Sequence, residues 1–437
     1  MNNENNNVET KGRAIALLPI GIFLVLFLGM GIVTGDFYKT PAIVCFLIAL
    51  LVAFMQNRKV KFGEKLQIIA KGVGDENIIT MCLIFLCAGA FSGTVSASGG
   101  VESTVNLGLS VLPAPFAVAG LFIIGCFISV SMGTSVGTVA ALIPIAVEIS
   151  NKTGFDMAIC AGAVMCGAMF GDNLSMISDT TIAAVKTQGC DMKDKFKENF
   201  LIVLPAAIIT LIVFLLLTRN GNFEVSGDLS YNIWKVLPYL FVLIGALIGI
   251  NVFIVLIGGT VLSLIVGVAT GAFPLSDVFV VMGNGVVGMY DITVISIIVA
   301  CIVSLVKEYG GIQFVLNVIR KGIKGQRGAE IGIAGLALVV DACTANNTVA
   351  IVMAGPIAKE ISDENGIDPK RSASLLDIFS SVGQGMIPYG AQLLTAATLA
   401  SLSPVEIMPY LYYPVLMAVS ALVFIIFRKR DKVKTEA

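Results

Sequence analysis

Long apolar runs recur along the whole chain and are separated by short polar segments. The apolar runs are continuous rather than alternating, which favours helices over the strands of a β-barrel. A helix of about 20 apolar residues crosses a hydrocarbon core of about 30 Å, so the pattern predicts an all-α polytopic membrane protein with about ten to twelve transmembrane segments. The candidate spans are 13–35, 40–56, 76–98, 113–133, 199–218, 232–250, 251–272, 287–307, 329–343 and 405–427.

Composition supports this class and excludes others. Of 437 residues, 57% are hydrophobic and 13% are charged, against about a quarter charged residues in a soluble domain. The net charge of −1 indicates no nucleic-acid partner. The sequence contains no histidine, which removes the usual catalytic base and zinc ligand. It also lacks a GxxxxGK[ST] loop. We therefore expect neither an enzyme, an ATP-driven pump nor a bound cofactor, apart from a transported or coupling ion.

Two regions lie between the candidate spans, at 134–185 and 344–402. Their apolar runs are too short or too polar to cross a membrane as simple helices, and the two regions resemble each other. "PIAVEISNKTGFD" (144–156) matches "PIAKEISDENGID" (356–368) at a shift of 212, with eight of thirteen positions identical. A shared Pro, Glu, Ser, Gly and Asp is not expected by chance, so the chain contains an internal repeat. The resulting division is 1–61 for the first helices, 62–185 for repeat one, 186–275 for a connection, 276–402 for repeat two, and 403–437 for the last helix and tail.

Basic residues indicate that the two copies cross the membrane in opposite senses. Five of them precede the first helix of copy one, in 58–71, whereas 275–290 before the matching helix has none. After that helix the pattern reverses, because 99–114 has none and 320–327 has four. Lys and Arg favour cytoplasmic loops, so the sequence predicts inverted-topology repeats with broken helices and re-entrant hairpins, as in many secondary transporters.

The same rule orients the chain ends. Lys11 and Arg13 lie at the start and five basic residues lie in 428–434. We expect both termini in the cytoplasm of a protein embedded in the cell (inner) membrane. The sequence leaves open whether it works alone or as a homodimer.

Polar residues interrupt the apolar pattern at matched positions of the two copies. "SMGTSVGT" (131–138) aligns with "CTANNTVA" (343–350), which places Thr134 and Ser135 opposite Asn346 and Asn347. Such side chains offer neutral oxygens to a cation, while the half-helix N-termini that follow favour anions. The breaks therefore suit either sodium or a carboxylate substrate.

A second interruption is acidic in one copy only. "GDNLSMISDTT" (171–181) aligns with "GQGMIPYGAQLL" (383–394), so Asp172 stands opposite Gln384. Glycines and a proline predict tight turns in both. Asn173, Gln384 and Gln392 are further candidates for ion or substrate coordination.

Four carboxylates are candidate ion or proton sites, since ionisable residues inside a membrane are costly and mark transport pathways. They are Asp172, Asp179, Asp341 and Asp377. Burial disfavours a charged carboxylate, so a site that holds either a proton or sodium, but not both, would exchange them. No intramembrane Lys or Arg is expected beside either break, and 186–199 is interpreted as an aqueous loop.

"GTSVGT" (133–138) together with "GDNLSMISDTT" resembles the paired signature of the NhaC-type sodium/proton antiporters, and "IPYGAQ" (387–392) resembles their second-copy motif. The resemblance implies inverted repeats with re-entrant hairpins, and exchange of protons for sodium at Asp172 and Asp179. Val136 and Met176 depart from the family pattern, which often has Trp and Pro there. The pattern carries onto Thr134, Ser135, Asp172, Ser175, Ser178, Asp179 and Thr180.

Two functions follow as hypotheses. The first is sodium/proton antiport by alternating access. The second is sodium- or proton-coupled transport of a small organic acid or amino acid, because hydroxyls and helix N-termini also hold a carboxylate. A channel is less favoured, since broken repeats are typical of alternating access.

Overall fold

The computed structural model describes residues 12–34, 41–111, 113–176, 178–219, 229–321 and 325–427, and every regular element in these ranges is helical. The first group of helices comprises α4 (Glu76–Ala97), α5 (Gly100–Val111), α6 (Ala117–Met132), α7 (Ser135–Thr153), α8 (Met157–Leu174) and α9 (Asp179–Gln188). The second comprises α14 (Tyr290–Glu308), α15 (Gly311–Lys321), α16 (Gly325–Thr344), α17 (Asn347–Asn365), α18 (Pro369–Met386) and α19 (Ala391–Ala400).

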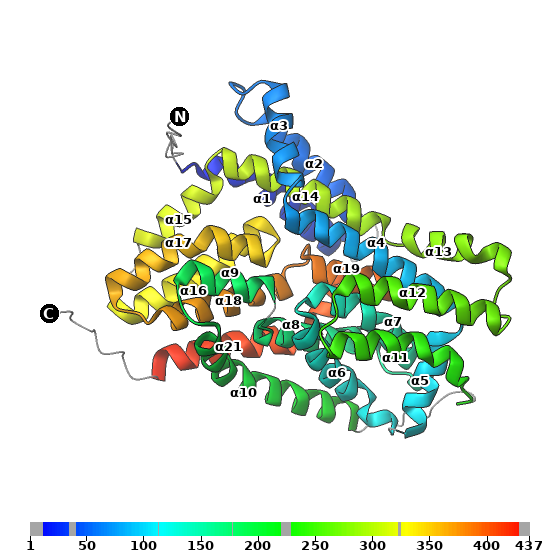
Figure 1. Ribbon diagram of the computed structural model, residues 1–437. Coiled ribbons are helices and arrows are strands. Elements are labelled where there is room, and N and C mark those ends of the chain that lie inside the picture. Colours follow the sequence, from blue (N-terminus) through cyan, green and yellow to red (C-terminus); the bar gives the residue numbers. More distant parts are fainter. Residues whose placement is uncertain are drawn as a thin grey trace, which may run out of the picture.

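The other helices surround these two groups. They are α1 (Leu18–Thr34), α2 (Ala42–Met55), α3 (Phe62–Val73), α10 (Met192–Arg219), α11 (Ile233–Leu247), α12 (Val252–Ala269), α13 (Val278–Val287), α20 (Pro404–Ile407) and α21 (Tyr412–Phe427), with short 3-10 turns at Ala14–Leu17, Ala114–Phe116, Leu275–Asp277 and Met408–Tyr410. In Figure 1, α10 and α21 run along one side of the molecule and α2, α3 and α14 lie at the opposite side, with the broken helices between them.

The polytopic all-α membrane class is confirmed. In the described ranges, seven helical segments are long and apolar enough to cross a membrane, and an eighth is added if the pair Pro404–Tyr410 and Tyr412–Phe427, bent by 51°, is one span. Two predicted spans form shorter helices, α2 with 14 residues and α11 with 15. The described ranges thus combine full-length spans with the shorter apolar helices Ala42–Met55, Ile233–Gly245 and Leu275–Val287.

The two groups of helices repeat each other at a constant shift. α7, α8 and α9 begin 212 positions before α17, α18 and α19 and have the same lengths. Left-handed backbone recurs at the same shift, at Gly133 and Ala345 and again at Gly154 and Gly366. The internal repeat is thus structural, whereas the five ranges proposed for the chain remain a prediction.

Both predicted interruptions are real breaks in helices. α6 ends at Met132 and α7 begins at Ser135, while α8 ends at Leu174 and α9 begins at Asp179. At the first break Gly133 has a φ of 66°, a value that glycine adopts without a steric penalty. Chain direction therefore changes inside an apolar region, and the freed backbone groups face a shared interior.

The short final helix of each copy packs against the helices of the other copy. α9 packs against α17 and α18, and α19 packs against α7 and α8. Such reciprocal packing is what a two-fold axis between the copies produces, and it brings both pairs of breaks together. The opposite orientation of the copies in the bilayer, and the cytoplasmic placement of the termini, stay predictions. Lys11 and 428–434 lie outside the described residues.

Candidate functional site

A cavity of about 490 Å³ lies where the breaks meet; we call it the central cavity. Six helices begin at it, and each contributes its first residue to the lining: Glu76 of α4, Ser135 of α7, Asp179 of α9, Val252 of α12, Asn347 of α17 and Ala391 of α19. A helix N-terminus carries a partial positive charge and unpaired N–H groups. The central cavity is therefore polarised by the backbone before any side chain is counted.

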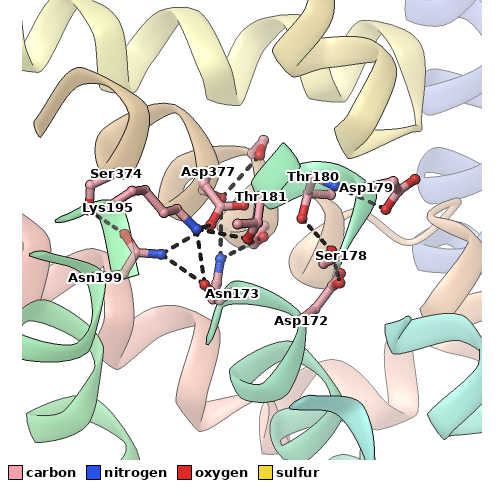
Figure 2. A network of polar contacts seen from close by, with 12 residues as sticks. Asp172, Asn173, Ser178, Asp179, Thr180, Thr181, Lys195, Asn199, Ser374 and Asp377 are labelled. Carbon is pink, nitrogen blue, oxygen red and sulfur yellow. Dashed lines mark hydrogen bonds and ion pairs between the residues drawn. The ribbon is translucent and has the colours of Figure 1, made fainter. Parts of the chain in front are cut away.

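Asp172 lies at the end of α8 with only 3% of its surface exposed. Its Oδ2 accepts a hydrogen bond from Ser135 at 2.8 Å, and its Oδ1 accepts one from Ser178 at 2.7 Å. Ser178 is also 2.8 Å from the Thr180 hydroxyl, as Figure 2 shows. Three hydroxyls thus surround one carboxylate, and both of its hydrogen-bond donors are neutral.

The second repeat reaches Asp172 through two amides. Gln392 donates to the Ser135 hydroxyl at 3.0 Å, and Gln384 donates to Gln392 at 2.8 Å. This chain of hydrogen bonds joins α18 and α19 to α7 and α8. A change in the charge of Asp172 is therefore felt in both copies.

Asp179 is the acid that faces the space of the central cavity. It begins α9 and its side chain is exposed there. Its Oδ2 accepts from the Thr348 hydroxyl of the second repeat at 2.7 Å, and its Oδ1 accepts from the Thr180 N–H at 3.0 Å. Asp172 and Asp179 therefore present an enclosed and an open carboxylate on one cavity.

The charge of the lining is negative. Among the described residues that line the central cavity, Glu76, Asp172 and Asp179 are acidic and none is basic. Opposite charges attract more strongly in a low-dielectric interior than in water. The arrangement thus suits a cation that exchanges with a proton, with side-chain and backbone oxygens as ligands.

Two predicted ligands act mainly as helix caps. The Thr134 side chain accepts from the Gly137 N–H at 3.3 Å, and the Asn346 side chain accepts from the Val349 N–H at 2.9 Å. Both line the central cavity, but an oxygen that caps a helix is less available to an ion. Ser175, by contrast, is buried beside the break and is not part of the cavity lining.

Asn347 differs from its neighbour. It lines the central cavity with 7% of its surface exposed. Its oxygen accepts from the Thr348 N–H at 3.1 Å, but its amide nitrogen has no hydrogen-bond partner in the part of the chain that the structure describes. A buried donor without a partner is costly, so this amide is suited to a ligand that accepts a hydrogen bond.

A buried lysine corrects the expectation that no basic residue lies beside a break. Lys195 of α10 is 1% exposed and forms an ion pair with Asp377, which is 0% exposed. The lysine also donates to the Asn173 carbonyl oxygen at 3.1 Å and to the Thr181 hydroxyl at 2.8 Å. Figure 2 shows Lys195 reaching this group from one side and Asn199 lying beside it. The segment expected to be an aqueous loop instead holds the end of α9 and the start of α10, and Lys195, Glu198 and Asn199 form a buried face of that helix start while Lys193, Asp194 and Lys197 are exposed.

Asn173 and Asp377 therefore belong to a lysine cluster and not to the central cavity. The Asn173 amide donates to Ser381 at 2.9 Å, and Asn199 donates to Asp377 at 3.0 Å and accepts from Ser374. Neither Asn173 nor Asp377 is among the lining residues of the central cavity. The structure separates the four candidate aspartates into a cavity pair, a lysine-bound one and Asp341, which stands apart.

Sequence reasoning overlooked several residues at the site. Thr348, residues 249–251 of the connection between α11 and α12, and the first two residues of α12 line the central cavity without a motif that marks them. Lys195 had a usable signal, because Lys195, Asn199 and Ile202 are spaced at four and three residues and are buried, as one face of a helix requires.

Broken, repeated helices around an acidic cavity within a membrane-spanning bundle define a secondary membrane transporter. The chain belongs to the Na+/H+ antiporter family, whose profile matches residues 7–218 and 230–429. The resemblance to NhaC-type proteins is thereby confirmed. The family is one of transporters and not of enzymes.

Individual relatives are distant but extend over the whole chain. The chain is 23% identical to the "Malate-2H(+)/Na(+)-lactate antiporter" of Bacillus subtilis, over 96% of this chain and 97% of that protein. It is 24% identical to the "Na(+)/H(+) antiporter NhaC" of Alkalihalophilus pseudofirmus, over 94% of each. The solved Alcanivorax borkumensis YdaH transporter has a TM-score of 0.42 and 13% identity, over 95% of this chain and 99% of that one.

Proposed function

We propose that this protein is a sodium/proton antiporter of the cell membrane, with both termini in the cytoplasm, and that sodium and protons compete for Asp172 and Asp179. The observation that carries the proposal is the acidic pair on a cavity whose described lining has no basic side chain. Asp172 is held only by the hydroxyls of Ser135 and Ser178. Its negative charge therefore needs a mobile cation.

Competition follows from the hydrogen bonds around Asp172. When the carboxylate is charged, Ser135 and Ser178 donate to it. Their oxygens also bond to Gln392 and Thr180, so a sodium ion would displace one of these contacts to reach them. When a proton binds, the carboxyl is neutral and its attraction for sodium is lost. Ser135 also accepts from Gln392 of the second repeat. Binding of sodium or a proton at Asp172 therefore changes a contact between the two repeats, as alternating access requires.

The proposal is tested in proteoliposomes that contain the purified protein and an internal pH dye. A sodium gradient should drive proton movement in the wild type, and Asp172→Asn and Asp179→Asn should each abolish it. Asp291→Asn is the matched control, since Asp291 is an exposed residue at the start of α14, and it should behave as the wild type. A full response in both cavity variants would refute the proposed site.

A second candidate is cation-coupled transport of a small organic acid or amino acid. The central cavity of about 490 Å³ has room for many more atoms than one sodium ion, since a water molecule occupies about 30 Å³. The unpartnered amide of Asn347 and six helix N-termini favour a carboxylate. The relative from Bacillus subtilis is named for malate and lactate.

Thermal stabilisation separates the two candidates. A panel of organic acids and amino acids is added with and without sodium, and the unfolding temperature of the purified protein is measured. Stabilisation by sodium alone supports the antiporter, whereas stabilisation by an organic acid that increases with sodium supports the second function. Sodium should be ineffective on Asp172→Asn in either case.

A further inference from the structure

Asp341 is an isolated carboxylate in the interior of the protein. It lies in the last turn of α16, where its carbonyl oxygen accepts from the Ala345 N–H at 2.7 Å, directly before the break in the second repeat. Its exposed fraction is 0%. Neither of its carboxylate oxygens has a hydrogen-bond partner among the residues that the structure describes.

This environment differs from that of the other buried aspartates. Asp172 accepts from two hydroxyls and Asp377 pairs with a lysine. An ionised carboxylate buried without any such partner loses its hydration and gains no contact that offsets the loss. In the conformation described here Asp341 therefore holds a proton.

The first copy has no carboxyl at the position that matches Asp341, so the packing of the repeat does not require one. The matching position in the first copy is Ser129, whose hydroxyl donates to the Ala168 carbonyl oxygen at 2.6 Å. In each copy this side chain lies against a glycine, Gly383 of α18 for Asp341 and Gly171 of α8 for Ser129. A Cβ on Gly383 would lie 2.6 Å from Asp341 Oδ2, and one on Gly171 would lie 2.3 Å from Ser129 Cβ. The second repeat thus makes room for a carboxyl where a serine suffices in the first.

Few ionisable groups face Asp341. Cys343 on its own helix and Tyr389, which follows α18, are within electrostatic reach, and both are neutral at ordinary pH. On α18, Asp377 is bound to Lys195. The ends of α16 and α18 away from the break carry Glu330 and Arg371, which bind each other.

The remaining helices packed against α16 add little charge near it. α21 has no charged residue between Tyr412 and Phe427, and the first charged residue of α17 is Lys359, near its far end. α14 contributes Lys307, which lines a smaller cavity. α15 carries its basic residues at its C-terminal end. Among the side chains that the structure describes, no basic group therefore bonds to Asp341.

A second, smaller cavity lies on the other side of the break, and Asp341 is not among its lining residues. The smaller cavity, of about 110 Å³, is lined by Thr344, Ala345, Asn346 and Tyr389 on the other side of the break. The Tyr389 hydroxyl donates to the Ala342 carbonyl oxygen at 2.5 Å and its ring meets Phe23 edge to face at 5.2 Å. Tyr389 therefore bonds to the turn that carries Asp341 and also lines the smaller cavity.

The break beside Asp341 is also strained. Ala345 has a φ of 51°, where the matching residue of the first copy is Gly133, and this left-handed conformation carries a steric penalty for alanine that glycine does not have. A rearrangement of this turn that broke the Tyr389 contact to Ala342 would open the carboxyl to the smaller cavity.

We infer that Asp341 carries a proton of its own through the transport cycle, separately from the cation pair Asp172 and Asp179. The inference rests on the proposed antiport for its role in transport, but not for the protonated state itself. Each cycle then moves one more proton than the central cavity alone exchanges for sodium.

The protonated state is tested by infrared spectroscopy of the purified protein in lipid at neutral pH. A protonated carboxyl gives a carbonyl band that a carboxylate does not. We expect a band that is lost in Asp341→Asn and in Asp341→Ser, which copies Ser129, and that is kept in Asp172→Asn and in the exposed control Asp291→Asn. No change of the band in either Asp341 variant would overturn the inference.

The transport role is tested by the proton-to-sodium ratio in proteoliposomes, taken from the sodium gradient that exactly balances a fixed pH gradient at zero flux. Asp341→Asn and Asp341→Ser should lower this ratio and keep sodium-dependent thermal stabilisation, which shows that they are folded and bind sodium. An unchanged ratio in both overturns the role. A wild type without any sodium-driven flux would instead refute the proposed antiport, while the infrared result still decides the protonation of Asp341.

Discussion

The lysine cluster gives the sharpest prediction about stability. Lys195→Met removes the ammonium group and keeps most of the length of the side chain. In the structure that ammonium uses all three of its donors, on Asp377, on the Asn173 carbonyl oxygen and on the Thr181 hydroxyl. The variant leaves Asp377 at 0% exposure with the Asn199 amide as its remaining donor.

The size of the effect follows from this burial. Removing one partner of a buried ion pair costs about 3–5 kcal/mol, because the other charge is left uncompensated. Replacing both, as in Lys195→Met with Asp377→Leu, removes the stranded charge and leaves only unpaired neutral groups such as the Asn199 amide, at about 1–3 kcal/mol. We expect the double variant to be more stable than Lys195→Met alone, with a coupling energy of about 2 kcal/mol or more.

The free energy of unfolding, measured in detergent micelles with a chemical denaturant, checks this cycle. Lys186→Met is the matched control, because Lys186 is an exposed lysine of α9, and its change should stay within about 0.5 kcal/mol. A loss in Lys195→Met no larger than in the control, or a double variant as unstable as the sum of the singles, would refute a buried structural ion pair.

Three further predictions follow from the contacts of the site. Ser135→Ala removes a donor to Asp172, and a hydrogen bond to a charged group is worth about 1.5–3 kcal/mol, so sodium affinity should fall by about ten-fold or more in calorimetry; unchanged affinity would contradict the ligand geometry. Gly171→Ala places a Cβ 2.3 Å from Ser129 Cβ and should lower stability by about 1–3 kcal/mol, unlike Gly21→Ala, where nothing lies within 4 Å. Asn347→Leu should leave sodium stabilisation intact and abolish any stabilisation by organic acids; retained organic-acid binding would exclude a role for its amide.

Local sequence was sufficient to predict the breaks, because their causes are local. Gly133 before Thr134 combines a left-handed residue with a helix cap, and the same pattern recurs at the second copy with Asn346. The break at Gly133 and Thr134 and the matching break at Ala345 and Asn346 both border the central cavity. The polar stretches were therefore recognisable as interruptions of helices before any coordinates.

The lysine cluster was not recognisable in this way. Lys195 lies in a run of charged residues that resembles an aqueous loop, and its partner Asp377 is 182 positions away. Only the packing of α10 against α18 brings them together. Long-range ion pairs of this kind depend on which helix faces meet, and one sequence does not specify that.

The unequal states of the aspartates depend on tertiary packing in the same way. Asp172 and Asp341 both follow apolar runs, yet Asp172 meets Ser135 and Ser178 whereas Asp341 meets the backbone of Gly383. Composition marks both as costly residues. Their separate environments are the basis for proposing an ion site at Asp172 and a protonated carboxyl at Asp341.

The competition of sodium and protons for Asp172 and Asp179 is the central claim, and the sodium Kd of the purified protein as a function of pH tests it most directly. If one proton must leave for each sodium that binds, the Kd should rise about tenfold for each unit of pH below the titration of the site. The exposed control Asp291→Asn should show the same slope, and Asp172→Asn should bind sodium weakly with little dependence on pH. A sodium Kd that does not change with pH in the wild type, or an unaltered slope in Asp172→Asn, would contradict the account.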